Sequence, residues 1–323
     1  MHYRRFGRLG WEVSEIGYGM WGMAGWSGSD DPTSHKALDL AVEMGCNFFD
    51  TAWAYGDGKS EQILAGLLKR HSTKKLYTAS KIPPKNRKWP PYKGSTIEEV
   101  FPKEYIIEYT EKSLSNLQVD TIDFLQFHVW EDQWSEHDDW KETVRMLKDQ
   151  GKVQSFGISV NRWEPANCIK TLDTGLIDGI QVIYNIFDQS PEDVLFPYCE
   201  KNNIAIIARV PFDEGSLTGN LSLDSRWAEG DFRNIYFGPE NLPSTIDRVE
   251  KLRSDIGNDM SLPEVSLRFI TSNPTVTTVI PGMRQLRNVE ANMKAGDGAG
   301  LSKEWIGKLR PHRWDRLPTD WSY

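Results

Sequence analysis

Four polar residues stand at or just beyond the ends of three apolar runs, and their types suit proton transfer. Asp50 ends the first run, and Tyr55 lies in the loop that follows it. Lys81 and His128 close the next two runs. We therefore expect four different polar groups at the ends of three successive strands, which is the layout of an active site.

The chemistry of this set starts from the phenol of Tyr55. An unperturbed tyrosine has a pKa of about 10 and is a poor acid at neutral pH. A nearby ammonium, here that of Lys81, favours the tyrosinate and lowers the phenol pKa. Asp50 can hold the lysine in place and keep it charged. His128 can offer an imidazole N–H to a substrate oxygen while Tyr55 delivers a proton.

These residues need strands to position them, and the sequence alternates short β-branched or aromatic runs with amphipathic stretches. Strands are predicted at residues 16–21, 47–51, 76–82, 122–129, 153–160, 179–186, 204–210 and 276–281, with helices between them, for example at 34–44, 60–69, 103–117 and 140–150. Eight such units favour a closed (β/α)8 TIM barrel, with its active site at the C-terminal strand ends. We predict one barrel domain over residues 1–323, with long loops at 83–102 and 211–243 and after 301 that serve as lids or binding loops.

The composition excludes several classes of protein. A net charge of −8 with 39% hydrophobic residues argues against a nucleic-acid footprint, which needs concentrated basic charge. No apolar run is long enough to span a bilayer, and the first residues do not resemble a secretory signal. Cys46, Cys168 and Cys199 are widely separated, which suits a reducing compartment. We expect a soluble cytoplasmic protein without a membrane or nucleic-acid partner, and its oligomeric state is left open.

The segments around Asp50, Tyr55, Lys81 and His128 resemble the aldo-keto reductase family, whose catalytic tetrad has these four residue types. The resemblance extends over essentially the whole chain. It implies an NAD(P)H-dependent oxidoreductase that reduces an aldehyde or ketone, with Tyr55 as general acid. NADPH is the favoured cofactor, and NAD is not excluded.

The same resemblance implies residues that hold the nicotinamide, with Asp50 among them. Ser159 closes a segment similar to the family's fifth strand, and Asn161 stands one place later than the family's asparagine. Gln181 matches a second amide ligand. Arg209 occupies the position where many members stack an aromatic ring, and a planar guanidinium can also stack. The alternative for Arg209 is an ion pair with a nearby acid.

The segment after the eighth predicted strand resembles the part of the family that holds the adenosine end. Arg284 is the candidate for the 2′-phosphate, and Asn292 is the candidate for the adenine. Asn288 stands where a basic residue sometimes lies, which weakens the case for strict NADPH preference.

Tryptophans are concentrated near the predicted strand ends and indicate an apolar or aromatic-lined pocket. The family resemblance implies that a small carbonyl or alcohol substrate binds there. Trp21 and Trp130 are expected to line it with Tyr55 and His128, and the other candidates are Trp26, Trp53 and Trp89. The tail from 311 to 323 is also rich in aromatic residues. It either walls the substrate pocket or packs Trp314 and Trp321 against the outer helices.

Two glycine-rich segments imitate nucleotide-binding motifs. Residues 17–22 fit G-x-G-x-x-G, but no helix follows directly, so they are predicted to be a strand end and loop. Residues 58–60 imitate the end of a P-loop, but Trp53 stands where that motif requires glycine.

The sequence also bears on three other functions. The acidic and histidine residues between 131 and 139 lack a defined ligand spacing, so a solvated loop is favoured over a metal site. A glycoside hydrolase needs a second carboxylate facing Asp50, and none is apparent. A cofactor-bound redox sensor or regulatory subunit with weak turnover is the remaining alternative, because a fold alone does not exclude it.

Overall fold

Eight parallel strands form the sheet in this computed structural model, which describes residues 1–25 and 30–316. The strands pair in chain order: β3 (Tyr18–Gly19), β4 (Phe48–Asp50), β5 (Tyr77–Ile82), β6 (Ile122–Phe127), β7 (Val153–Ser159), β8 (Gly179–Ile183), β9 (Ala205–Arg209) and β10 (Thr278–Val279). Two isolated parallel bridges, Ile16 to Val279 and Gly19 to Gly282, join the first and last strands. The (β/α)8 barrel predicted from the sequence is therefore confirmed.

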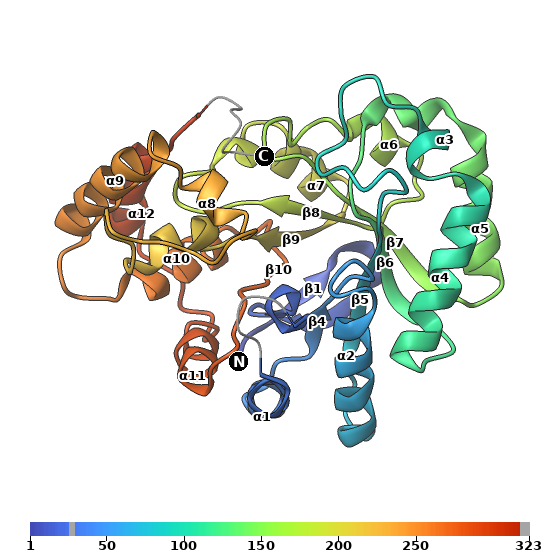
Figure 1. Cartoon of the computed structure of the whole chain (residues 1–323), viewed down its shortest axis with the longest axis horizontal. Coiled ribbons are helices and arrows are strands. Elements are labelled where there is room, and N and C mark those ends of the chain that lie inside the picture. Colours follow the sequence, from blue (N-terminus) through green and yellow to red (C-terminus); the bar gives the residue numbers. More distant parts are fainter. Residues whose placement is uncertain (26–29, 317–323) are drawn as a thin grey trace.

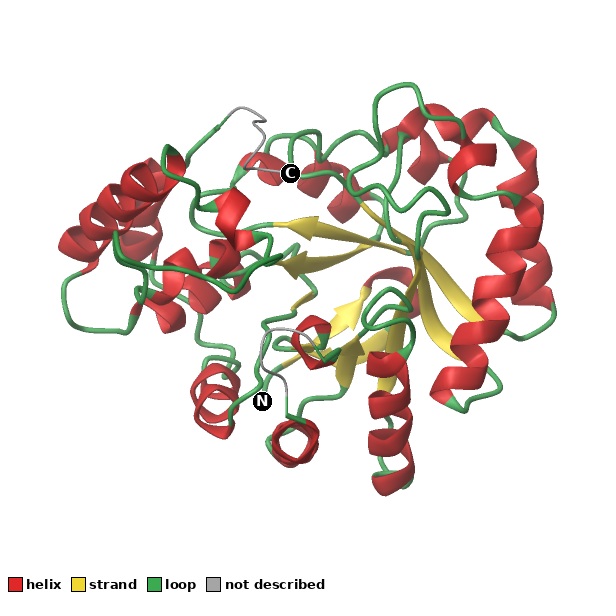
Figure 2. Ribbon diagram, in the orientation of Figure 1, coloured by secondary structure: helices red, strands yellow, loops and turns green. Residues whose placement is uncertain are grey.

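The helices surround the strands, as Figure 1 shows, with α2, α4 and α5 on one side of the barrel, α9, α10 and α12 on the other, and α1 beside α11 between these groups. The helices of the described residues are α1 (Asp31–Glu43), α2 (Lys59–Arg70), α3 (Ile97–Val100), α4 (Lys103–Leu117), α5 (Asp138–Asp149), α6 (Ile169–Asp173), α7 (Leu195–Lys201), α8 (Arg233–Tyr236), α9 (Asn241–Ile256), α10 (Leu262–Thr271), α11 (Leu286–Lys294) and α12 (Lys303–Leu309). In Figure 2, long loops connect the strand ends to these helices.

Local sequence explains where the outer helices begin and which face they bury. In α10 the hydroxyl of Ser261 accepts a hydrogen bond from the Glu264 N–H, and Pro263 occupies the first turn, where a missing donor costs little. In α5 the buried residues Trp140, Thr143, Val144 and Leu147 recur every three or four positions. That spacing places one stripe of the helix against the sheet.

Alternation within the strands separates two cores. Side chains at every second position point into the barrel, where Phe48, Ala79, Phe124 and Ile207 belong to one buried cluster. The Phe124 ring fills the space beside Gly157, whose added Cβ would lie 2.1 Å from the ring. The intervening positions pack outward against the helices and form the larger core.

An N-terminal hairpin that the sequence analysis did not anticipate closes the amino-terminal end of the barrel. Its strands are β1 (Tyr3–Phe6) and β2 (Trp11–Ser14). Phe6 and Val13 alternate with polar residues and are buried in the cluster inside the barrel. The Phe6 ring packs edge to face against Phe124, with 5.2 Å between the ring centroids.

All eight predicted strands are longer than the observed ones, by one to four residues. The largest differences concern the first and last strands, because the ladder is interrupted there. The chain pairs as a strand only at Tyr18–Gly19 and then enters a 3-10 helix at Trp21–Met23. At Gly19 the neighbouring backbone is very close, since a Cβ would lie 2.6 Å from the Ile280 carbonyl oxygen.

Candidate active site

The four tetrad residues meet inside the carboxyl end of the barrel because the strand period places them there. Asp50 ends β4, Lys81 lies at the fifth position of β5, and His128 directly follows β6. Each follows a barrel-facing residue at a spacing of two or four, so all three point inward. Tyr55 reaches the same place from the loop after β4.

The Lys81 ammonium is the centre of the arrangement. Its Nζ donates hydrogen bonds to Asp50 Oδ2 at 2.6 Å, to the Thr51 carbonyl at 2.7 Å and to the Tyr55 hydroxyl at 3.3 Å. The side chains of Lys81 and Asp50 are 0% and 2% exposed. All three ammonium donors thus have acceptors, which a buried charge requires.

The other carboxylate oxygen of Asp50 is also satisfied. Gln181 donates to Asp50 Oδ1 at 2.7 Å, and Gln126 donates to the same oxygen at 3.3 Å. Gln126 was missed in the sequence analysis. Its position in the sequence could have identified it, because a polar residue two positions before His128 must point to the same side of the strand as His128. In the structure Gln126 is buried.

Burial and the ion pair set the charge states of the tetrad. Burial would lower the pKa of Lys81, but Asp50 and Tyr55 reverse that effect and raise it, so the ammonium stays protonated. Burial raises the pKa of Tyr55, and Lys81 offsets only part of this. The prediction that Lys81 lowers the phenol pKa therefore holds for its own contribution and is wrong for the net direction. Tyr55 remains a protonated donor at neutral pH.

His128 is neutral in this environment. Burial lowers its pKa well below the ordinary value, and the charges of Lys81 and Arg209 lower it further. Its ring lies edge to face with Tyr55 at a centroid distance of 5.8 Å and with Trp89 at 5.6 Å. Nδ1 is buried without a hydrogen-bond partner among the described residues.

A pocket of about 180 Å³ opens above Tyr55 and His128. Four residues predicted to hold the cofactor line it, namely Ser159, Asn161, Gln181 and Arg209. The remaining lining residues are Trp89, Pro90, Pro91, Val129, Trp130, Val160, Arg162, Ile183 and Glu214. Of the long loops, 83–102 and 211–243 thus both contribute to the pocket.

The polar groups of this pocket fit the carboxamide end of a nicotinamide. Gln181 uses its amide nitrogen on Asp50 and keeps its carbonyl oxygen for another donor. The Nε donors of Arg209 and Arg162 are buried and have no partner among the described residues. Such unsatisfied buried groups call for an explanation, and a polar ligand supplies one.

Arg209 donates its side-chain hydrogen bond to a backbone carbonyl rather than to an acid, and its stacking on a nicotinamide stays a prediction. Arg209 ends β9 and donates from Nη2 to the Val160 carbonyl at 3.2 Å. Burial lowers the pKa of its guanidinium, and the carboxyl of Glu214 acts in the opposite direction. Arg162 and Glu214 were not singled out from the sequence, because nothing local marks a loop residue that reaches a pocket.

The residues predicted to contact the adenosine lie on the segment after β10 and on helix α11, which come after β9 and Arg209 in the barrel. Arg284 follows β10, Asn288 is exposed on α11, and Asn292 is buried on the same helix. Because β10 pairs in parallel with β9, this segment begins at the same edge of the barrel as Arg209. None of the three lines the 180 Å³ pocket, and their roles stay predictions. Arg287, exposed on α11, is a second basic residue of this segment, and nothing in the local sequence marks it as a cofactor contact.

The tryptophan predictions had mixed outcomes. Trp130 lines the pocket, although it is only 1% exposed and its indole N–H is bonded to Thr171. Trp89 also lines it. Trp21 does not, and its ring instead contacts Phe232. Trp53 packs against Tyr109 and is likewise outside the pocket. Trp26 lies outside the described residues.

The tail is described as far as Arg316, and Trp314 in it packs between the loop after β8 and helix α9. Trp314 donates its backbone N–H to the Phe187 carbonyl and packs edge to face against that ring. Arg248 of α9 lies 4.2 Å from the Trp314 ring centroid. The packing alternative therefore describes Trp314, whereas Trp321 falls outside the described residues.

The acidic segment 131–139 is engaged with protein partners. Asp132 accepts hydrogen bonds from the Thr171 backbone and hydroxyl, and His137 pairs with Glu98. In residues 1–25 and 30–316, no group of three or more His, Cys, Asp or Glu side chains is arranged to hold a metal ion.

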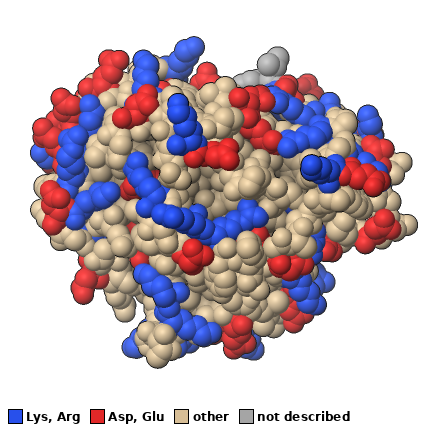
Figure 3. Space-filling model, turned by 180° about the vertical axis from the view of Figure 1, so that it is seen from behind, with Lys and Arg blue, Asp and Glu red and all other residues tan. Residues whose placement is uncertain are grey.

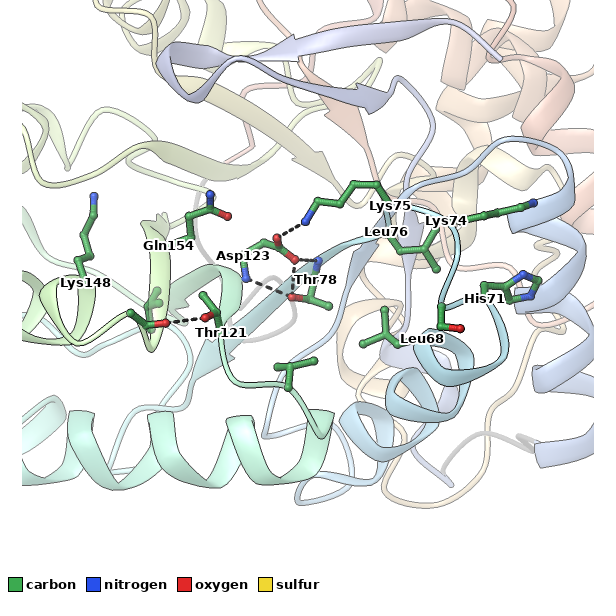
Figure 4. Close-up of a pocket in the computed structure, with 14 residues that line it drawn as sticks. Leu68, His71, Lys74, Lys75, Leu76, Thr78, Thr121, Asp123, Lys148 and Gln154 are labelled. Atoms are coloured by element: carbon green, nitrogen blue, oxygen red, sulfur yellow. Dashed lines mark hydrogen bonds and ion pairs between the residues drawn. The ribbon is translucent and has the colours of Figure 1, made fainter.

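A second, wider cleft of about 710 Å³ lies at the amino ends of β5, β6 and β7 (Figure 4). Lys75 pairs with Asp123 at 2.7 Å, and Thr78 donates twice to the same carboxylate. The Lys148 ammonium pairs with Asp178. This cleft lies at the opposite end of the strands from the tetrad, and its charged groups Lys75, Asp123 and Lys148 are paired with protein partners.

Charge on the surface is mixed. Figure 3 shows acidic and basic side chains interspersed, with basic ones gathered across the middle of that face. In the part of the chain that the structure describes, no helix has the length and apolar character to cross a membrane.

Comparison with known proteins gives a consistent result. The model of the "Aldo/keto reductase family" matches residues 15–313. The "Uncharacterized oxidoreductase YqkF" of Bacillus subtilis is 30% identical over 97% of this chain and 96% of its own length. The "NADH-specific methylglyoxal reductase" of Escherichia coli is 27% identical over 88% of this chain and 90% of its own. The holo form of an aldo-keto reductase from Bacillus halodurans superposes with a TM-score of 0.79, at 25% identity over both whole chains.

Proposed function

Because the chain belongs to the aldo/keto reductase family, we propose that it is an NAD(P)H-dependent reductase of aldehydes or ketones in which Tyr55 is the general acid. The observation that carries this proposal is the buried Asp50–Lys81–Tyr55 relay, with Lys81 Nζ 2.6 Å from the carboxylate and 3.3 Å from the phenol. A lysine whose three donors are satisfied in this way is a fixed charge beside the proton donor.

The cofactor supplies a hydride when bound, and Ser159, Asn161, Gln181 and Arg209 would hold its nicotinamide end. Tyr55 then donates its proton to the carbonyl oxygen, and Lys81 stabilises the phenolate that remains. His128, neutral at physiological pH, donates an imidazole N–H to the same oxygen and orients it. Trp89 and Trp130 form the aromatic side of the pocket and exclude water from the reacting atoms.

The preference between NADPH and NADH depends on the segment after β10. Arg284 can form a charge-assisted, bidentate contact with a 2′-phosphate, which only NADPH carries. Asn288 supplies no second positive charge. We therefore propose NADPH as the favoured cofactor, with NADH also accepted.

A panel of aldehydes and ketones, each assayed with NADPH and NADH, tests the proposal. We expect consumption of the cofactor to depend on the carbonyl compound and to be lost in Tyr55→Phe. Cofactor binding without turnover on any compound would favour the regulatory alternative.

A further inference from the structure

Five buried polar side chains from five separate segments form one cluster beside the active-site pocket. They are Arg162 after β7, Asp188 after β8, Asp213 after β9, Tyr236 of α8 and Arg316 of the C-terminal segment. Each is at most 8% exposed. Polar groups this deeply buried are as a rule hydrogen-bonded, and these five side chains bond to one another.

The cluster is charge-balanced and shared almost symmetrically by its two arginines. Arg316 Nη2 lies 2.8 Å from Asp213 Oδ1 and 3.1 Å from Asp188 Oδ2. Arg162 Nη2 lies 3.1 and 3.3 Å from the same two oxygens. The Tyr236 hydroxyl donates to Asp213 at 2.7 Å and accepts from both guanidinium groups at 2.8 and 2.9 Å. Burial would raise the pKa of Asp213, but Arg316 and Arg162 lower it to about 2.

The loop that begins at the end of β9 needs such support, because its backbone is strained. Val210, Asp213 and Glu214 have φ values of +55°, +44° and +55°, in the left-handed region that favours glycine. Strain of this kind persists only where surrounding contacts hold the backbone in place. Asp213 anchors the centre of this loop, and its neighbour Glu214 faces the pocket beside Arg209.

We propose that Arg316 is a positioning residue for the cofactor side of the pocket. By bonding Asp188 and Asp213, it ties the C-terminal segment to the 210–219 loop and holds Arg209, Glu214 and Arg162 in the wall of the pocket. Only the cofactor readout of this inference depends on the proposed function. The tether itself is a property of the cofactor-free chain.

Arg316→Gln is the test, and Arg313→Gln is its matched control. Arg313 lies three residues earlier on the same segment and also pairs with two aspartates, Asp193 and Asp315, but its side chain is 32% exposed and neither partner belongs to the cluster. In Arg316→Gln we expect the dissociation constant for NADPH to rise about tenfold or more, because a wall that is no longer preorganised binds less tightly. We expect kcat at saturating cofactor to stay within about threefold, since the tetrad is untouched. The control should change neither value more than about twofold.

Amide hydrogen exchange of residues 210–219 in the cofactor-free protein gives a second readout. Faster exchange in Arg316→Gln, but not in Arg313→Gln, supports the tether.

Arg316→Lys keeps the charge but lacks the planar fork, so it should restore cofactor affinity only in part. If Arg316→Gln does not fold, Tyr236→Phe tests the tether in its place, because this variant keeps the ion pairs and loses only the bridging hydroxyl. Its NADPH dissociation constant should then rise about threefold.

The inference is overturned by a folded Arg316→Gln with parental exchange and parental affinity, or by Tyr236→Phe with parental affinity where the glutamine variant does not fold. A lower kcat at unchanged affinity would also contradict it. A parent protein that binds no nicotinamide dinucleotide contradicts the proposed function instead, and the exchange measurement still decides the tether.

Discussion

The pocket at the carboxyl ends of the strands and the cleft at their amino ends are built on the same alternating strands. The cleft is wider, about 710 Å³ against 180 Å³, yet its charged groups are already paired, for example Lys75 with Asp123. In the pocket, His128 Nδ1 and the Nε donors of Arg162 and Arg209 have no partner among the described residues. The comparison shows that volume alone does not identify a ligand site, because the smaller pocket is the one that holds buried polar atoms for a ligand to satisfy.

The largest effect should follow from removing the proposed proton donor of the pocket. Tyr55→Phe is expected to lower carbonyl reduction by about 10² to 10⁴-fold, the usual contribution of a positioned general acid. Cofactor affinity should be nearly parental, because the phenol ring is retained. Steady-state kinetics and a fluorescence titration with NADPH measure the two quantities. Turnover within a few-fold of the parent would remove Tyr55 from the mechanism.

Lys81→Met tests whether the pocket depends on its buried charge. The variant leaves Asp50 without its ion pair, and breaking a buried pair costs about 3–5 kcal/mol of unfolding free energy. Turnover should fall at least about 10²-fold, since the cation beside the phenol is lost. The double variant Lys81→Met/Asp50→Asn removes both charges, so denaturant unfolding should show recovered stability without recovered turnover. Recovery of both, or of neither, would contradict this account.

Arg284→Ala extends the comparison to the adenosine end. We expect it to weaken NADPH binding by about tenfold or more and NADH binding by much less, because only NADPH offers a phosphate to the guanidinium. Parallel titrations with both cofactors measure the difference. Arg287→Ala, on the exposed face of α11, is the matched control. Equal losses for NADPH and NADH would exclude a 2′-phosphate contact at Arg284.

The burial of His128 beside two positive charges predicts that the stability of the protein depends on pH. Its pKa is lowered in the folded chain, so below about pH 6.5 the unfolded chain binds a proton that the folded chain does not. The free energy of unfolding should therefore decrease as the pH falls below about 6.5, by up to about 1.4 kcal/mol per pH unit. His128→Gln lacks this dependence, so its stability relative to the parent should increase between pH 7.5 and 5.5. A constant difference in urea unfolding would show that His128 titrates normally.

The smallest effect is expected in the cleft. Lys75 is 62% exposed, and exposed ion pairs contribute about 0–1 kcal/mol. Lys75→Gln should change stability by no more than that amount and leave turnover within about twofold. A large loss of activity would mean that the cleft is functional, and the contrast drawn between the two ends would be wrong.

The positions of the tetrad could be predicted from the sequence because strand alternation is a local property. Once the apolar runs are recognised as strands, Asp50, Lys81 and His128 must stand at their carboxyl ends. Eight such runs in series led to the barrel, which the structure confirms. The closure of the barrel between β3 and β10 is harder to predict from the sequence, because both are two-residue strands that exist only because distant segments pair.

Gln126 shows which part of a site can be predicted from the sequence and which part requires the tertiary structure. Its place on the inward face of β6 follows from the period of two, but its bond to Asp50 depends on how far the barrel brings β4 and β6 together. The net pKa of Tyr55 is another case. The sequence predicts that Lys81 lies near Tyr55 and lowers the phenol pKa, but it does not predict that burial raises this pKa by more.

The sequence by itself determined which residues could perform the chemistry and on which strands they lie, because residue type and side-chain alternation are local. Only the tertiary structure decided that Trp130 and Trp89, rather than Trp21, line the pocket. It alone joined Arg162, Asp213 and Arg316, which are separated by 51 and 103 residues along the chain. Contacts across such separations depend on how every intervening element packs, and no local pattern records that packing.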